Sequence, residues 1–311
     1  MKVGLIDVDG HNFPNIPLMK LSAWHKSRGH SVEWYKPLLS GHLDVVYCAK
    51  VFSFTPDYSF PISSKIIIKG GTGYCIKNEN GIERMEKETQ LLPDEIEHTY
   101  PDYELYGIKD RAYGFLSRGC PRGCDFCHVK SKANEGRKSH KVADLKEFWG
   151  GQREIEICDP NILACRDWRD LLQQLIDSKA QVEFNQGLDA RFLCDENIRY
   201  LAQIKLKSVH FALDRMKDCH IVLSGIKQFC DNVKGNPRNI SVYVLVNFDT
   251  TFEEDLYRIY KLREIGVSPY VMIYDKEHCS AQYIRLQRWV NSRFIFWSTP
   301  KFEDYVHGVV K

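Results

Sequence analysis

Alternating strand and helix patterns across the last two thirds of the chain constrain its fold most strongly. From residue 112 onward, short β-branched and apolar runs alternate with stretches of helical period. We predict strands at 112–117, 153–158, 181–185, 207–213, 240–247 and 270–274, and helices at 143–149, 167–178, 195–204, 220–233 and 252–265. Strands joined by helices pair in parallel, because each helix returns the chain to the starting edge of the sheet.

This alternation predicts six β/α units between residues 112 and 311. A closed eight-unit barrel needs about 250 residues, which is more than this region contains. A partial (β/α)6 barrel of the TIM type therefore fits the region better.

The first 75 residues predict a small Rossmann-like domain. Its strands are expected at 2–8, 31–35, 44–52 and 65–69, with a helix from about Asn15 to Arg28 after the first strand. Pro56 and Pro61 interrupt any helical period between 53 and 64. Residues 76–111 show no clear period and are interpreted as a linker. The chain is thus expected to be an α/β protein with parts 1–75, 76–111 and 112–311.

Composition excludes several classes of protein. Apolar residues make up 43% of the 311 residues and charged residues 27%, which is typical of a globular chain. The net charge of +2 gives no general attraction to nucleic acid, so stable nucleic-acid binding is not expected. No apolar run approaches 18 residues, so no membrane partner is expected either. Asp7 and Asp9 stand where a signal peptide would be apolar, which predicts a cytoplasmic protein.

Cysteine is unusually frequent, with eleven residues, and three of them are clustered. Cys120, Cys124 and Cys127 form a C-x3-C-x2-C pattern directly after the first predicted barrel strand. Three thiolates so close in sequence can converge on one metal centre. If that centre is a 4Fe–4S cluster, three ligands leave one iron open.

Two other interpretations of the three cysteines stay open. A zinc site would need a fourth ligand, which His128 could supply, although its adjacency to Cys127 strains that geometry. The three residues could also be unrelated core cysteines.

The cysteine spacing, Phe126 before the last cysteine, and the six β/α units together make residues 112–280 resemble the radical S-adenosylmethionine (SAM) superfamily. The resemblance implies that Cys120, Cys124 and Cys127 hold a 4Fe–4S cluster whose open iron binds SAM. It further implies cleavage of SAM to a 5′-deoxyadenosyl radical, which abstracts hydrogen from a substrate. A low-potential electron donor such as flavodoxin or ferredoxin is then an expected partner.

The remaining cofactor contacts are predicted from polar residues at the ends of the barrel strands. The family often carries a Gly-Gly-Glu-like segment after its second strand, and this chain has Cys158-Asp159-Pro160-Asn161 there. Arg191 and Arg215 are candidates to pair with the SAM carboxylate. A solvated loop or a helix cap is the alternative for each residue. The predicted cofactor-binding set is Phe126, Asp159, Asn161, Asn185, Arg191, Asp214 and Arg215.

The N-terminal domain resembles the cobalamin-binding domain of one radical SAM branch, in a degenerate form. The supporting features are its order of elements and the Gly70-Gly71 turn. Without a helix between 53 and 64 it offers little lining for cobalamin, so it is interpreted as a cover over the barrel. His11 and Asn12 are predicted substrate contacts in this domain.

The whole chain resembles the queuine lyase family of compact radical SAM enzymes. This resemblance implies a nucleoside-like substrate, queuosine or its 5′-phosphate, from which queuine is released. Asp159 and Asp189 are then the candidate catalytic residues, and Asn185 and Asp189 are candidate substrate contacts. The alternatives are a cobalamin-dependent radical SAM methyltransferase and a non-enzymatic iron–sulfur or zinc-binding module.

Overall fold

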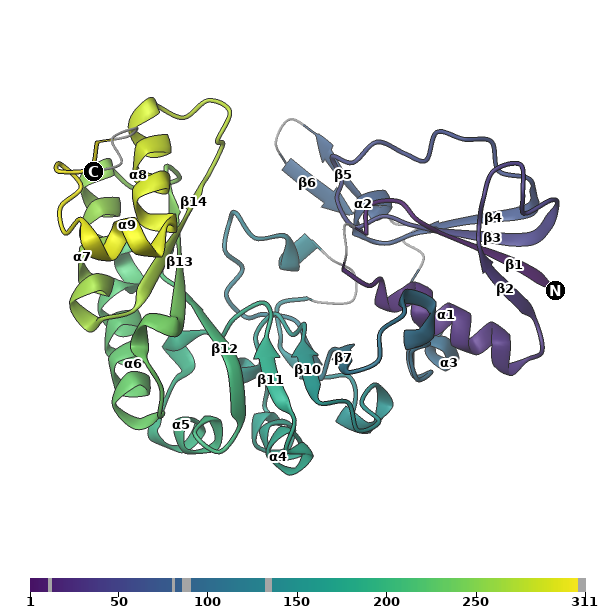
Figure 1. The fold of residues 1–311 in the computed structure, drawn as a ribbon, viewed down its shortest axis with the longest axis horizontal. Coiled ribbons are helices and arrows are strands. Elements are labelled where there is room, and N and C mark those ends of the chain that lie inside the picture. Colours follow the sequence, from purple (N-terminus) through teal and green to yellow (C-terminus); the bar gives the residue numbers. More distant parts are fainter. Residues whose placement is uncertain (11–12, 80–81, 86–90, 132–135, 307–311) are drawn as a thin grey trace. The chain divides into compact units, whose positions relative to one another are not determined.

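The structure is a computed structural model that describes residues 1–10, 13–79, 82–85, 91–131 and 136–306. It has the predicted α/β class, with parallel sheets of four and six strands (Figure 1). By compactness the chain divides into two units, Met1–Asp167 and Trp168–Lys311. The boundaries predicted at 75 and 111 both fall inside the first unit.

The four-stranded sheet has the strand order β2-β1-β3-β4, and every pairing in it is parallel. Its strands match the four predicted ones and are β1 (Lys2–Asp7), β2 (Ser31–Trp34), β3 (Leu43–Ala49) and β4 (Ser64–Gly70). Helix α1 (Ile16–Ser27) joins β1 to β2. The side chain of Asn15 accepts the backbone N–H of Leu18 at 3.2 Å, so Asn15 caps this helix as its residue type favours.

Residues 91–110 pack against α1 and the four-stranded sheet. This segment contains α3 (Asp94–Glu97) and a 3-10 helix, η1 (Tyr103–Tyr106). Ile96 is buried in the same core as Leu18 and Val3. Before it lie α2 (Thr72–Cys75) and an antiparallel hairpin of β5 (Ile76–Glu79) and β6 (Ile82–Met85). The region predicted as a linker therefore contributes core residues.

The six-stranded sheet follows the chain in strand order from β7 to β14, and its six strands coincide with the six predicted ones. Strand β7 pairs in parallel with β10, and β11, β12, β13 and β14 pair in parallel in that order. Within the part of the chain that the structure describes, β7 and β14 are the edges of this sheet. The strands are β7 (Arg111–Gly114), β10 (Glu154–Ile157), β11 (Gln181–Phe184), β12 (Lys205–Ala212), β13 (Ile240–Val246) and β14 (Ser268–Ile273).

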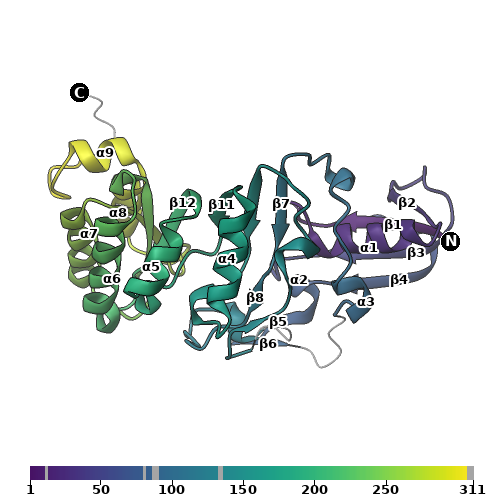
Figure 2. The same cartoon turned by 90° about the horizontal axis from the view of Figure 1, so that it is seen from below.

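Helices α4, α5, α6 and α7 of the second unit pack one against the next, as Figure 2 shows. The helix predicted at 143–149 is instead a 3-10 turn, η3 (Leu145–Glu147), which Asp144 and Glu147 cap reciprocally. The sequence prediction also missed the last two helices. The helices of this unit are α4 (Trp168–Ser178), α5 (Asp195–Leu201), α6 (Cys219–Asn232), α7 (Phe252–Ile265), α8 (Ala281–Asn291) and α9 (Arg293–Ser298).

Strand β7 ends at Gly114, where the ring of Phe148 occupies the space that a Cβ would need. A Cβ at this glycine would lie 2.4 Å from the ring. Only glycine lets the ring approach the backbone so closely. Among the described helices, none has the length and apolarity needed to cross a bilayer.

Candidate functional site

A two-stranded ladder fixes both ends of the segment that carries the clustered cysteines. Strand β8 (Ser117–Arg118) pairs antiparallel with β9 (His140–Lys141), so that Ser117 lies opposite Lys141. We call residues 119–139 between these strands the cysteine loop. Strand β7 ends at Gly114, and the loop follows this strand, as the sequence predicted.

None of the three clustered cysteines is in a disulfide, and each is partly exposed to solvent. The backbone N–H of Cys127 donates to the carbonyl of Cys124 at 3.1 Å, which closes a turn between these two residues. Gly119 and Gly123 have φ of +88° and +56°, values that L side chains rarely adopt. These two glycines let the loop change direction on either side of Cys120.

The donor set fits an iron–sulfur cluster, which is held by cysteine thiolates. Three thiols lie on one loop, partly accessible, and none is used in a disulfide. In the described residues, no three His, Cys, Asp or Glu side chains already form a group that could hold a metal ion. Binding of a cluster would thus require the three sulfur atoms to converge.

Asp159 follows β10 and holds the chain just before the cysteine loop. Its Oδ1 accepts the backbone N–H of Leu116 at 2.8 Å, and its Oδ2 accepts the N–H and the hydroxyl of Ser117, each at 2.6 Å. The residue is only 3% exposed. Burial raises the pKa of this carboxyl to about 7, although the three hydrogen bonds act in the opposite direction. The structure therefore places Asp159 as an anchor for Leu116 and Ser117.

Asn161 lies two residues further on and contacts the first cysteine directly. Its Nδ2 donates to the Sγ of Cys120 at 3.5 Å. Its backbone carbonyl accepts the hydroxyl of Ser139, at the other end of the cysteine loop, at 3.0 Å. The sequence predicted Asn161 as a SAM contact and did not predict this contact with Cys120. Phe126, the remaining predicted residue of this loop, is partly buried.

In the second unit, two predicted site residues bind each other. Arg191 donates from Nε to Asp189 Oδ1 at 2.7 Å and from Nη2 to Asp189 Oδ2 at 3.0 Å. Its Nη1 also donates to Asp218 Oδ2 at 2.7 Å. Burial alone would lower the pKa of Arg191, but the two carboxylates outweigh it and raise the pKa. Asp189 and Arg191 thus form one ion-paired cluster with Asp218.

The other predicted residues of the second unit lie after β11 and β12. Asn185 is partly exposed in the turn after β11. Asp214 accepts the backbone N–H of Leu245 at 3.0 Å, and burial raises its pKa. Arg215, the next residue, is partly buried.

A fully buried ion pair beneath these strand ends was missed from sequence. Arg258 donates to the carbonyls of Leu213 and Leu245 at 2.6 and 2.8 Å, and it pairs with Asp255 one helical turn before it. Both side chains have no exposed area. The sequence could have indicated this ion pair, because Asp255 and Arg258 are three residues apart on the face of α7 that buries Leu262. Arg258 therefore fixes the backbone at the ends of β12 and β13.

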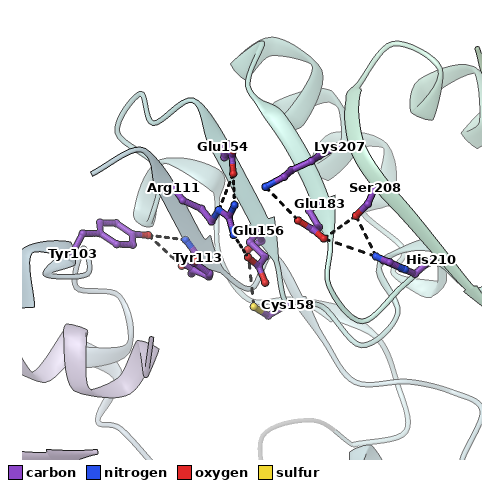
Figure 3. A network of polar contacts seen from close by, with 10 residues as sticks. All are labelled: Tyr103, Arg111, Tyr113, Glu154, Glu156, Cys158, Glu183, Lys207, Ser208 and His210. Atoms are coloured by element: carbon purple, nitrogen blue, oxygen red, sulfur yellow. Dashed lines mark hydrogen bonds and ion pairs between the residues drawn. The ribbon is translucent and has the colours of Figure 1, made fainter. Parts of the chain in front are cut away.

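Sequence reasoning also missed a polar network on β7 and β10, which Figure 3 shows. Arg111 donates from Nε to Glu154 Oε2 at 2.8 Å, and its Nη1 lies 3.3 Å from Glu156 Oε2. Tyr113 lies on the same strand as Arg111, two residues along, and its backbone N–H donates to the hydroxyl of Tyr103 at 3.0 Å. Residues two apart on a strand lie on the same face of the sheet. Polar residues at this spacing, Arg111 with Tyr113 and Glu154 with Glu156, could therefore have indicated this network from the sequence.

A second polar network, drawn in the same figure, joins β11 to β12. Ser208 donates its hydroxyl to Glu183 Oε1 at 2.7 Å, and its Oγ lies 3.2 Å from His210 Nε2. Because the single hydroxyl proton is directed to the carboxylate, Nε2 of His210 must be the donor to Ser208. Burial lowers the pKa of His210. The ring of His210 stacks on Tyr243 of β13, with centroids 5.5 Å apart.

The N-terminal domain has one comparable anchor. The carboxylate of Asp9, which is 3% exposed, accepts the backbone N–H groups of Val51 and Phe52, each at 2.8 Å. The predicted substrate contacts His11 and Asn12 lie outside the described residues.

Comparison of the chain with protein-family models, with curated proteins and with solved structures finds no match. Any assignment of function therefore depends on the residues and contacts described above.

Proposed function

We propose that this chain is a radical SAM enzyme whose 4Fe–4S cluster is held by Cys120, Cys124 and Cys127. One observation carries the proposal. The three cysteines lie on a loop after β7, the first strand in the order of the six-stranded sheet, and the residue that hydrogen-bonds Cys120 comes from the segment after β10, the second strand. A radical SAM barrel requires this juxtaposition of its first two strand ends.

The six strands in chain order, each followed by helix or loop, support a partial (β/α)6 barrel as the finer architecture. When bound, a 4Fe–4S cluster of this kind supplies the electron that cleaves SAM to a 5′-deoxyadenosyl radical. A flavodoxin or ferredoxin is the proposed source of that electron.

Asp159 and Asn161 have distinct parts in this proposal. Asp159 fixes the backbone before the cysteine loop, and Asn161 orients the sulfur of Cys120. Asn185, Asp214 and Arg215 remain the proposed contacts for SAM. Arg191 holds the carboxylate of Asp189 in place through a bidentate ion pair. We therefore propose that the two residues contact the substrate together.

For the substrate we propose a nucleoside-like molecule, with release of queuine from queuosine or its 5′-phosphate as the specific lyase reaction. The near-neutral charge suits a small substrate better than a whole tRNA. The carboxylates and amides at the strand ends can pair with the polar edge of a deazaguanine base. The N-terminal domain is proposed to cover the site.

The cluster is tested by anaerobic reconstitution with iron and sulfide. Replacing Cys120, Cys124 and Cys127 together by Ala should abolish the visible 4Fe–4S absorbance and all SAM cleavage. Replacing Cys48 or Cys230 should preserve both, because these two cysteines lie far from the loop in sequence and are not clustered. A triple variant that keeps a full cluster would disprove the ligand assignment.

The lyase reaction is tested separately, by chromatography of anaerobic reactions with SAM, reductant and queuosine or its 5′-phosphate. Queuine should appear together with 5′-deoxyadenosine. If SAM is cleaved but no queuine forms above the SAM-free control, the lyase assignment fails and the radical SAM assignment stands. Absorbance after incubation with cobalamin tests the methyltransferase alternative in the same preparation. A chain that binds iron or zinc but never cleaves SAM would be the non-enzymatic module.

A further inference from the structure

The side chain of Asn161 donates a hydrogen bond to one of the proposed cluster ligands, with its Nδ2 3.5 Å from the Sγ of Cys120. Asn161 is only 3% exposed. Its amide is therefore largely shielded from water, and such shielding increases the electrostatic effect of a hydrogen bond.

Hydrogen bonds also attach the backbone of Asn161 and the carboxylate of Asp159 to neighbouring parts of the chain. The carbonyl of Asn161 accepts the hydroxyl of Ser139 at 3.0 Å and the N–H of Ala164 at 3.3 Å. Two residues earlier, the carboxylate of Asp159 binds the backbone of Leu116 and Ser117. Both ends of the 159–161 segment are thus attached to the chain that carries Cys120.

Hydrogen bonds to the sulfur atoms of an iron–sulfur cluster are one of the features that set its reduction potential. A reduced cluster carries more negative charge on its sulfur atoms than an oxidised one. An N–H directed at such a sulfur stabilises the reduced state more, and so raises the potential.

We propose that Asn161 is a positioning residue that raises the reduction potential of the cluster through its hydrogen bond to Cys120. This inference rests on the proposed function, because it requires a cluster at the three cysteines. It gives the carboxamide a redox role, in addition to the SAM contact expected from sequence.

The experiment is a redox titration of the reconstituted full-length chain, followed by the electron paramagnetic resonance signal of the reduced cluster. Asn161→Leu removes the donor at similar side-chain volume, and its midpoint potential should shift to a more negative value. Asn161→Asp also lacks the donor and adds a negative charge, so its potential should shift further in the same direction. Ser139→Ala is the matched control, because it removes a contact to the Asn161 backbone and leaves the amide–sulfur pair. Its potential should equal that of the wild type.

The outcomes separate this inference from the proposed function. If the wild type takes up no 4Fe–4S cluster, the proposed function fails and the inference with it. If all chains load equal iron and the potential of Asn161→Leu equals that of Ser139→Ala, the redox role is overturned while the proposed function stands. Loss of the cluster from both Asn161 variants in a folded chain would show a purely structural part for this residue, and would also overturn the inference.

Discussion

The segments that follow β10 and β11 each carry a predicted site acid, but they hold it in different ways. After β10, Asp159 is bound by two backbone N–H groups and one hydroxyl, all uncharged. After β11, Asp189 is bound by the guanidinium of Arg191. Burial among neutral donors raises the pKa of Asp159 to about 7, whereas Asp189 has a full positive charge beside it. An acid beyond a strand end can therefore anchor a backbone or join an ion pair, and the partner decides which.

The largest expected effect is that of Asp159→Ala on the stability of the first unit. At pH 6, loss of the carboxyl leaves the buried N–H groups of Leu116 and Ser117 without a partner, at a cost of about 1–3 kcal/mol for each group. The free energy of unfolding in urea should fall by about 3 kcal/mol. Hydrogen exchange should also accelerate at residues 116 and 117, and peptides from 189–218 serve as the internal control. Unchanged exchange at 116 and 117 would contradict the anchoring role.

The pH dependence of stability should reveal two opposing groups in the first unit. The pKa of Asp159 is raised to about 7, so its contribution is full below pH 3.8 and is lost as the pH rises through 7. The pKa of His25 is lowered to about 4 by burial and then by the charges of His30 and Arg28, so its contribution is full above pH 6.5 and is lost as the pH falls through 4. At about 1.4 kcal/mol per pKa unit, the contribution is roughly 4 kcal/mol for Asp159 and roughly 3 kcal/mol for His25, and the two oppose each other between pH 4 and 6.5.

Single variants should separate these two contributions. In His25→Gln, stability should fall more steeply than in the wild type as the pH rises from 4 to 7, because the contribution of Asp159 is no longer opposed by that of His25. In Asp159→Asn, stability should rise more steeply than in the wild type from pH 4 to 6.5, because the contribution of His25 is no longer opposed by that of Asp159. Urea denaturation at pH 4.5, 5.5 and 6.5 measures both slopes. Parallel curves for the two variants would show that these pKa shifts are not the source of the pH dependence.

Asp189→Ala should have a smaller effect than Asp159→Ala. Arg191 would keep its bond to Asp218, at 2.7 Å, and its side chain is 18% exposed, so its charge stays paired. We expect a loss of about 1 kcal/mol in the free energy of unfolding, as for a partly exposed ion pair. A loss as large as that for Asp159→Ala would remove the distinction between the two segments.

Asn185→Ala should leave stability almost unchanged, within about 0.5 kcal/mol, because the side chain lies partly exposed in a turn. If Asn185 contacts SAM as proposed, the variant should raise the SAM concentration needed for half-maximal cleavage. Thermal denaturation and SAM cleavage are measured on the same preparation. Unchanged cleavage would remove Asn185 from the site.

Most strands were predictable because each is a short apolar run bounded by glycine, proline or acids. Asn15 likewise marked the start of α1. Helix α8 was missed, although Tyr283, Leu286 and Val290 repeat at helical spacing, because the strand pattern had ended before it. The helix predicted at 143–149 failed because reciprocal capping by Asp144 and Glu147 closes a single turn.

The sequence allowed the residues of the candidate site to be predicted better than the contacts between them. The three cysteines were predicted as ligands of one centre and Asn161 as a SAM contact, whereas the hydrogen bond between Asn161 and Cys120 was not predicted. The partners of Asp159 at Leu116 and Ser117 could not be predicted, because every residue except proline has a backbone N–H and the residue type does not show which one is bound. The ion pair between Asp189 and Arg191 could not be predicted without the geometry of the η5 turn (Ala190–Phe192), which brings the two side chains together.

The ladder of β8 and β9 also has a consequence for how the cysteine loop can vary. Because Ser117 and Lys141 are held opposite each other, the ends of the loop meet whatever its length. The entropy cost of closing a loop grows only with the logarithm of its length, so doubling it costs about 0.6 kcal/mol. The cysteine loop can thus be lengthened at little thermodynamic cost to the sheet that follows.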